Sequence, residues 1–252
     1  MKRKTQKKQK YSHSLIFLHG FTANSCEMEF YRTKINDIVP DNVNMKYIFL
    51  NAPRRKVSYF RLKEKYKKPF CKSLYQAWYD YLSDNAQSKI EIEDIINTKH
   101  VDQQRKRIHK FIEKEIKYHK GDSKKVFIGG YSQGACMALD SGITFSKKIG
   151  GIIGIKGHIL GHTDTAKKYK QDIFVSNSKG DQTIYFSVAK KSYLKYKKYN
   201  FNIKIIVHNE GELRGRPAGH NMEDGQNKEF SELGKWLQTK LKIKKNININ
   251  IN

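Results

Sequence analysis

Short apolar runs alternate along the chain with longer stretches in which polar residues interrupt the apolar ones. The apolar runs cover residues 14–18, 46–50, 125–129, 149–155, 172–177 and 202–208. Runs of this length, ended by polar or glycine-containing turns, are typical of buried strands. From Val101 to Ile116 the apolar positions instead recur at helical spacing, and Gly121 follows them as a helix-ending residue. The pattern thus predicts strands and helices in alternation.

The remaining stretches complete an α/β arrangement. Further helices are predicted over about residues 27–38, 133–142, 185–199 and 227–241, and segment 55–76 is predicted to be a long loop or lid. Short apolar strands that alternate with helices form a mostly parallel central sheet with helices on both faces. With four prolines and no linker-like segment, we predict one domain over residues 12–242, a basic arm over 1–11 and a polar tail over 243–252.

Composition limits the class of protein. The chain has 252 residues, of which 38% are hydrophobic, enough for a continuous core. Its apolar runs are too short to span a bilayer, and no signal-peptide apolar region follows the basic start. The cysteines, Cys26, Cys71 and Cys136, are odd in number and lack metal-ligand or disulfide spacing, which fits a reducing compartment. We therefore expect a cytoplasmic protein without a metal.

The charge is strongly positive, with 50 Lys and Arg against 24 Asp and Glu and a net charge of +26. Such a balance favours an anionic partner such as nucleic acid or a membrane surface. It also arises when a compositional bias toward lysine leaves solvated side chains all over the surface. The basic residues are spread along the whole chain rather than gathered with aromatic residues in one stripe. We therefore expect weak contact with anionic membranes and no specific nucleic acid.

One nearly uncharged stretch, "GGYSQGACMALD" (residues 129–140), carries candidate chemistry. Its "GYSQG" core matches G-x-S-x-G, with a predicted strand before it and a predicted helix after it. In that context the serine occupies a strained turn, and the flanking glycines are needed because a Cβ would clash with the neighbouring strand and helix. An ordinary turn with the same letters is the alternative. The context favours Ser132 as a nucleophile at the carboxyl edge of the sheet.

A serine nucleophile needs a base and an acid, which on this fold follow it in the order acid, then histidine. Asp181 lies just past the carboxyl end of a predicted strand, the edge where such sites form. It could instead only cap the next helix. Two histidines follow it: His208 ends a strand, whereas His220 lies in a glycine-containing loop that could reach the serine. We predict Asp181 as the acid and His220 as the base.

Negative charge that develops on an attacked carbonyl needs hydrogen-bond donors. The backbone N–H of Gln133, directly after the serine, is one candidate. The other is the backbone N–H of Phe21, in the "HGFTAN" loop after the first strand. These two groups form the predicted oxyanion hole.

The ordered set "FLHGF", "NAPRR", "AWYDY", "GGYSQGACMAL", "SKGDQTI" and "GHNM" resembles the acyl-protein thioesterase and lysophospholipase-like carboxylesterases of the α/β-hydrolase superfamily. The resemblance covers about residues 14–241. It implies a hydrolase with little or no separate cap domain, no cofactor, and acyl ester or acylated-protein substrates, including palmitoyl groups on cysteine. It implies the same Ser132, Asp181 and His220, and it matches Trp78 to an aromatic residue near the acyl-binding region.

A second function class stays open at this point. A hydrolase scaffold that has lost activity could bind polyanions or anionic membranes through its lysines. A third possibility is an esterase or peptidase that acts on small soluble substrates. The presence of serine, aspartate and histidine in the expected order favours an enzyme.

Overall fold

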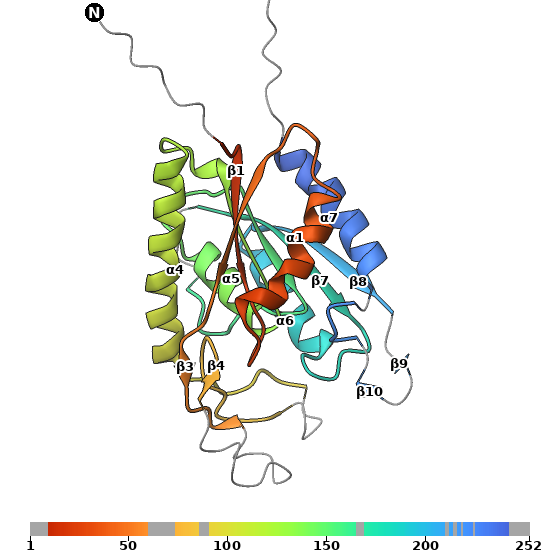
Figure 1. The fold of residues 1–252 in the computed structure, drawn as a ribbon. Helices are drawn as coiled ribbons and strands as arrows, with labels where there is room; N and C mark the ends of the chain where they lie inside the picture. Colours follow the sequence, from red (N-terminus) through yellow and green to blue (C-terminus); the bar gives the residue numbers. More distant parts are fainter. Residues whose placement is uncertain are drawn as a thin grey trace, which may run out of the picture.

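A six-stranded sheet runs through the centre of the molecule (Figure 1). The structure, a computed structural model, describes residues 10–59, 74–85, 91–164, 169–209, 212–213, 216–217, 219–223 and 225–241. In spatial order the strands are β2 (Met45–Leu50), β1 (His13–Leu18), β5 (Val126–Tyr131), β6 (Gly151–Ile155), β7 (Asp172–Ser178) and β8 (Asn202–His208). Every neighbouring pair in this sheet is parallel. The carboxyl ends of all six strands therefore meet at one edge.

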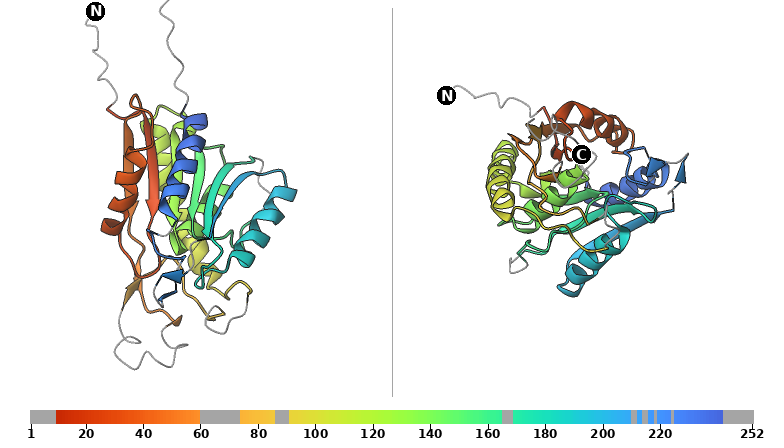
Figure 2. Two further views of the ribbon diagram at one scale, coloured as in Figure 1. Left: turned by 90° about the vertical axis from the view of Figure 1, so that its right-hand side faces the viewer. Right: turned by 90° about the horizontal axis from the view of Figure 1, so that it is seen from below.

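Helices cover both faces of the sheet (Figure 2). One face carries α4 (Thr98–Tyr118), α5 (Gln133–Ile143) and α6 (Phe186–Lys198), and the other carries α1 (Glu29–Asn36) and α7 (Gln226–Lys240). Alternation along β1 separates two cores: Ile16 packs with the first group of helices and Phe17 with the second. The predicted α/β-hydrolase architecture, a parallel sheet with helices on both faces, is confirmed.

Helix α4 shows how the sequence pattern becomes a packed element. Val101, Ile108 and Ile112 are fully buried on its inner side, while its lysines lie outside. The Asn97 side chain caps its start by accepting a hydrogen bond from a backbone N–H. Gly121, with φ 92°, bonds back to the carbonyl of Ile116 and ends it.

The predicted elements are close to the observed ones, and the main differences lie in small pieces. The helix predicted over 27–38 is a 3₁₀ turn, η1 (Ser25–Met28), followed by α1, and a second 3₁₀ turn, η2 (Ser123–Lys125), precedes β5. The ends of the predicted loop 55–76 form an antiparallel pair, β3 (Arg54–Arg55) with β4 (Tyr75–Gln76). Two further short strands, β9 (Glu212–Leu213) and β10 (Arg216–Pro217), also form a pair. Most of that loop, the predicted tail and nearly all of the predicted arm lie outside the described residues.

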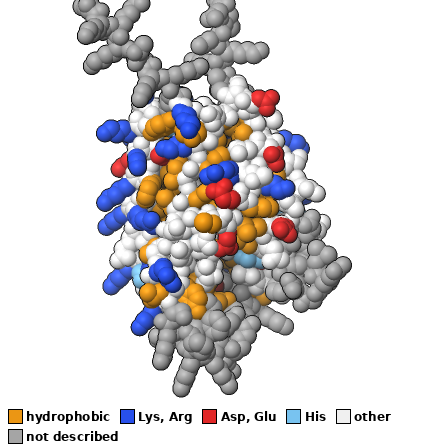
Figure 3. All heavy atoms as spheres, viewed as in Figure 1, with side chains coloured by type: hydrophobic (Ala, Val, Ile, Leu, Met, Phe, Trp, Pro, Cys, Tyr) orange, Lys and Arg blue, Asp and Glu red, His pale blue; other side chains and the backbone are white. Residues whose placement is uncertain are grey.

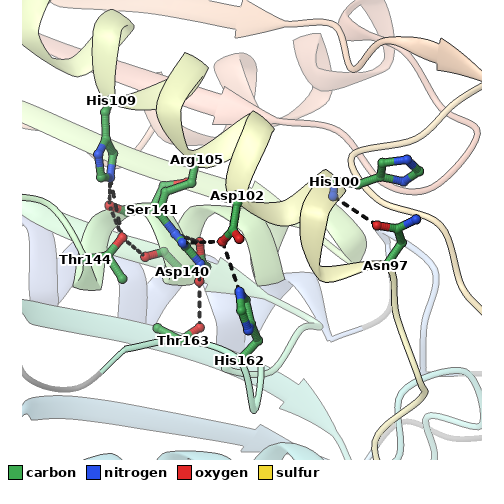
Figure 4. Close-up of polar contacts among 10 residues, drawn as sticks. All are labelled: Asn97, His100, Asp102, Arg105, His109, Asp140, Ser141, Thr144, His162 and Thr163. Carbon is green, nitrogen blue, oxygen red and sulfur yellow. Dashed lines mark hydrogen bonds and ion pairs between the residues drawn. The ribbon is translucent and has the colours of Figure 1, made fainter.

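A polar cluster, buried at one end, connects α4, α5 and the loop after β6 (Figure 4). The fully buried carboxylate of Asp140 accepts hydrogen bonds from Arg105 at 2.7 and 2.8 Å and from the Thr163 hydroxyl at 2.8 Å. Arg105 also donates to Asp102, which accepts a further bond from His162 at 3.0 Å. We call these five residues the α4–α5 polar cluster. It attaches the loop after β6 to two helices.

Both described ends of the chain lie at the amino edge of the sheet (Figure 1). Lys10 precedes β1, and Leu241 follows α7, which runs antiparallel to the strands. Among the described residues, no helix has the length and apolar character that crossing a bilayer requires.

Candidate active site

Ser132 joins the end of β5 to the start of α5. Its backbone has φ 55° and ψ −124°, a conformation that a non-glycine residue adopts only when its surroundings enforce it. Its N–H bonds to the carbonyl of Ile155 on β6 at 2.9 Å. A Cβ on Gly130 would lie 2.3 Å from the Gly134 carbonyl oxygen, and one on Gly134 would lie 2.3 Å from that of Leu18. The prediction that the strained turn needs both glycines is confirmed.

The three side chains predicted as nucleophile, base and acid meet at the carboxyl edge of the sheet. The Ser132 Oγ lies 2.9 Å from His220 Nε2, and His220 Nδ1 lies 2.7 Å from Asp181 Oδ2. Because a carboxylate can only accept, a neutral imidazole here carries its proton on Nδ1, and Nε2 is then left to accept from the serine hydroxyl. This tautomer is the one in which imidazole can remove a proton from the serine.

Asp181 is almost completely buried and its orientation is fixed from both sides. Its Oδ1 accepts from the backbone N–H groups of Thr183 and Ile184 at 2.8 and 2.9 Å, while Oδ2 faces His220. Asp181 is not the cap of α6, which starts after Tyr185 and has no side-chain cap, and its role as the acid stays a prediction. Asp181 organises the turn that leads into α6, and the same turn directs its second oxygen at the imidazole.

His208, the alternative base, lies elsewhere. It ends β8, is 3% exposed, and lies beneath the turn before α7, where a Cβ on Gly225 would be 2.4 Å from its Nδ1. The structure brings His220 to Ser132 and leaves His208 in a packed structural position.

The loop after β1 lies beside the serine and is held by His19. The His19 Nδ1 donates to the carbonyl of Gly20 at 2.7 Å, and its Nε2 accepts from the N–H of Ala52 at 2.9 Å. Burial lowers the pKa of His19, although its hydrogen bond to Gly20 acts in the opposite direction. A neutral ring suits both contacts, because Nε2 can accept only when it carries no proton. Phe21, next along the loop, lines the same cavity as Ser132.

Trp78 supports this loop directly, and Gln133 holds the segment of Trp78. Gln133 is the first residue of α5, where backbone N–H groups lack helical partners, and its buried side chain binds the backbone of Trp78 and Tyr79. The Trp78 indole N–H donates to the carbonyl of His19 at 2.8 Å. Trp78 has no exposed surface, so in this structure it supports the His19 loop and offers no surface for direct substrate contact.

A cavity of about 830 Å³ opens over the serine. Its walls come from the loop after β1, the end of β5, the turn that holds Asp181 and the segment of His220. They include Phe21, Ala23, Tyr131, Thr183, Met222 and Glu223. Within the described part of the chain, no group of three or more His, Cys, Asp or Glu side chains is placed to hold a metal ion.

Two residues at this site were not predicted from the sequence. The Tyr131 hydroxyl donates to the backbone carbonyl of His220, and the ammonium of the fully buried Lys156 donates to that of Asn221. The variable position of G-x-S-x-G gives no indication for Tyr131. Lys156, however, is the one charge within the run "GIIGIKGHIL", and a charge that interrupts a buried apolar run is a usable signal.

Comparison with known proteins settles the family. Residues 3–210 match the phospholipase/carboxylesterase family. The chain belongs to this family. The sequence-based resemblance to carboxylesterases is thereby confirmed.

Curated relatives agree with this assignment. Acyl-protein thioesterase 1 of Saccharomyces cerevisiae is 29% identical over 146 residues, which are 57% of this chain and 57% of the yeast protein. That of Debaryomyces hansenii is 23% identical over 76% of this chain and 80% of its own. The alignment with the first of these thus spans little more than half of the relative.

Solved structures show the same fold. Arabidopsis thaliana SOBER1 has a TM-score of 0.72 at 20% identity, covering 91% of this chain and 99% of its own. Zea mays acyl-protein thioesterase 2 has a TM-score of 0.67 at 18% identity, covering 94% and 97%.

Proposed function

We propose that the protein is a serine hydrolase that cleaves carboxylic ester or thioester bonds of acyl substrates through an acyl-serine intermediate. The observation that carries the proposal is the chain of contacts from Ser132 through His220 to Asp181, opening into the cavity. Each side chain has the partner that its role requires, and the serine faces the space that a substrate would occupy. Membership of the phospholipase/carboxylesterase family supports the same reaction class.

The first half-reaction forms the acyl-enzyme. Ser132 Oγ attacks the acyl carbonyl while His220 Nε2 takes its proton, and Asp181 stabilises the imidazolium through Nδ1. The carbonyl oxygen becomes an oxyanion, for which the backbone N–H groups of Phe21 and Gln133 are the proposed donors. The imidazolium then gives its proton to the leaving alcohol or thiol as the C–O or C–S bond breaks.

The second half-reaction returns the enzyme. Water takes the place of the leaving group and loses a proton to His220 as it attacks the acyl-serine carbonyl. Collapse of the second oxyanion breaks the bond to Oγ, which recovers its proton from the imidazolium. The products are a carboxylic acid and an alcohol or thiol, and none of these steps uses a cofactor.

The proposed substrates are acyl esters and acylated proteins. The three thioesterases named above are all called acyl-protein thioesterases, and the cavity walls combine apolar side chains with polar ones. An acyl chain would contact the apolar part of the walls. The leaving group, whether lipid, peptide or protein, would extend into solvent at the cavity mouth.

We further propose a cytoplasmic protein that makes weak, salt-sensitive contact with anionic membranes. Two cysteines, Cys26 and Cys136, have free thiols, which suits a reducing compartment. Basic side chains line the α4 edge of the face shown in Figure 3, and exposed lysines also occur on α6. Binding to vesicles that contain anionic lipid should weaken steeply as salt is raised from about 50 to about 200 mM. Added salt shortens the Debye length, which is ~10 Å at 0.1 M, and so screens the attraction between exposed charges. Binding that is unchanged over this range would contradict an electrostatic contact.

Labelling with a fluorophosphonate probe tests the serine mechanism directly. The folded protein should acquire one covalent adduct at Ser132, located by mass spectrometry, and Ser132→Ala should acquire none. Ser123→Ala, in η2 at the other edge of the sheet, is the matched control and should label like the unaltered protein. A folded protein that takes up no probe would instead support a binding protein on a hydrolase scaffold.

Turnover of acyl substrates of graded chain length then tests the bond type. We expect hydrolysis of p-nitrophenyl esters and of acyl-thiol substrates, with a preference for one chain length set by the cavity walls. Labelling at Ser132 without hydrolysis of any acyl ester or thioester would retain the nucleophile and reject the proposed substrates.

A further inference from the structure

Two hydrogen-bond donors reach the backbone of the histidine segment from the sheet beneath it. The Tyr131 hydroxyl, at the end of β5, donates to the carbonyl of His220. The Lys156 ammonium, just after β6, donates to the carbonyl of the next residue, Asn221. Two consecutive carbonyl groups are thus held by side chains from two neighbouring strands.

Lys156 is an unusual residue to find at this place. Its side chain is fully buried, and its backbone has a left-handed φ of 52°, which is unfavourable for any residue other than glycine. Burial of an ammonium group costs several kcal/mol unless it is well hydrogen-bonded. Both unfavourable features occur at the edge of the sheet where the candidate site lies. Local rules are broken in this way mainly at functional sites, which indicates a functional role for the ammonium.

The backbone of Lys156 is tied to that of Ser132 through the pairing of β5 with β6. The N–H of Ser132 bonds to the carbonyl of Ile155, the residue before Lys156, at 2.9 Å. The N–H of Lys156 bonds to Ser176 on β7 at 2.7 Å, and a Cβ on Gly157 would lie 2.6 Å from that of Ala135 in α5. The origin of the lysine side chain is therefore fixed relative to Ser132.

The geometry points to Tyr131 and Lys156 as positioning residues that fix the backbone of His220, so that its Nε2 meets the serine hydroxyl. We call the pair the carbonyl clamp. This inference rests on the proposed function of His220 as the base. The Asp181 contact sets the direction of the imidazole ring but not the place of its Cα; the clamp supplies that second constraint.

Loss of a clamp hydrogen bond is expected to displace His220 and so to lower turnover. A hydrogen bond from an ammonium to a carbonyl is stronger than one between neutral groups, and it is strengthened further away from water. Small displacements of a catalytic group, of about 1 Å, can reduce turnover by ~10²-fold. Loss of either donor therefore acts on turnover more than on substrate binding.

The test uses Tyr131→Phe, which removes one hydroxyl, and Lys156→Met, which removes the charge and keeps the length of the side chain. With a soluble acyl ester, each variant should lose about 10- to 100-fold in kcat while KM changes by less than about threefold. Because both donors hold one segment, the double variant should lose much less than the product of the two single losses. Lys46→Met is the matched control: Lys46 is part-buried on β2 and bonds Glu115 at 2.8 Å, away from the site, and its kcat should not change.

Amide hydrogen exchange of residues 219–223 gives a readout that needs no activity. Exchange there should accelerate in both clamp variants and remain as in the parent in Lys46→Met. If the unaltered protein shows no Ser132-dependent turnover, the proposed function fails, and the exchange experiment still tests the clamp. Unchanged kcat and unchanged exchange in Tyr131→Phe would overturn the clamp, even if Lys156→Met does not fold.

Discussion

Two clusters of hydroxyl, histidine and carboxylate side chains lie at different positions along α5, and they have opposite characters. At the start of the helix, Ser132, His220 and Asp181 face a cavity of about 830 Å³. Further along it, the α4–α5 polar cluster combines Asp140 with Thr163, and Asp102 with His162, around Arg105 (Figure 4). Similar residue types therefore occur in both.

The clusters differ in the hydrogen-bond partners of their hydroxyl groups. The carboxylate of Asp140 accepts three bonds, two of them from an arginine, and its hydroxyl neighbour donates directly to it. In the described part of the chain, the printed partner of the Thr163 hydroxyl is the carboxylate of Asp140 and not an imidazole. Ser132, by contrast, has a strained backbone, an imidazole nitrogen as its hydrogen-bond partner and a cavity in front of it. Residue type alone therefore does not distinguish the two clusters; the backbone strain, the partner of the hydroxyl and the neighbouring cavity do.

The largest expected effect is on turnover at the first cluster. Ser132→Ala and His220→Ala should each reduce kcat by on the order of 10⁵- to 10⁶-fold, because the three residues act as a unit. For the same reason, the double variant should be little worse than either single one. Steady-state kinetics on protein shown to be folded by circular dichroism measures this. A folded Ser132→Ala protein with parental turnover would remove the distinction between the clusters.

The same substitution in the two clusters separates catalysis from stability. Asp181→Asn should reduce kcat about 10⁴-fold with the fold retained, because the amide favours the wrong imidazole tautomer. Asp140→Asn should lower the free energy of unfolding by about 3 kcal/mol, because it breaks a buried ion pair with Arg105. Its kcat per folded molecule should stay within about threefold of the parent. Urea titration and kinetics on both variants make the comparison, and a large kcat loss in Asp140→Asn would show that the second cluster reaches the site.

The two late histidines provide a smaller contrast. His208→Ala should cost about tenfold or less in turnover, and mainly through stability, because the ring is packed under Gly225 and does not reach Ser132. Thermal unfolding followed together with kcat separates these contributions. If His208→Ala damages turnover more than His220→Ala in folded protein, the base is misassigned.

The smallest expected effect is a pH dependence at the exposed end of the second cluster. Burial raises the pKa of Asp102, but the hydrogen bond from His162 and the charge of Arg105 lower it more, so the net pKa lies below its ordinary value. A carboxyl with a depressed pKa in the folded state contributes stability above its unfolded pKa of about 3.9, and this is lost as the pH falls below it. The side chain is 45% exposed, so the contribution should be under about 1 kcal/mol.

Asp102→Asn checks this effect. Its free energy of unfolding should differ from that of the parent by less at pH 3 than at pH 7, and its turnover should be unchanged. A difference that grows as the pH falls would contradict the assigned direction.

The sheet, the order of its helices and the three residues at Ser132 could be predicted because each has a local signal. Apolar runs mark the strands, G-x-S-x-G marks the turn, and parallel strands bring Asp181 to the same edge as the serine. The contacts made to backbone groups could not be predicted in this way. Nothing in the sequence indicates that Tyr131 and Lys156 meet the carbonyls of His220 and Asn221, because a carbonyl acceptor has no residue type.

For Trp78 the sequence predicts the residue but not its exposure. A resemblance transfers the identity of an aromatic residue without its exposure, and here the indole is fully buried against His19. The pairing of β3 with β4 was missed because each has two residues and the partners are about twenty positions apart. The catalytic roles of the site residues, as distinct from their positions, remain predictions that the variants above will test.

The placement of Lys10 and Leu241 at the amino edge of the sheet, opposite the cavity, has a practical consequence. A surface linker attached at Lys10 or at Leu241 would be anchored on the side away from Ser132. Molecules immobilised in this way would present the cavity mouth to solution, so large acylated proteins could be offered to a tethered enzyme without the support blocking access.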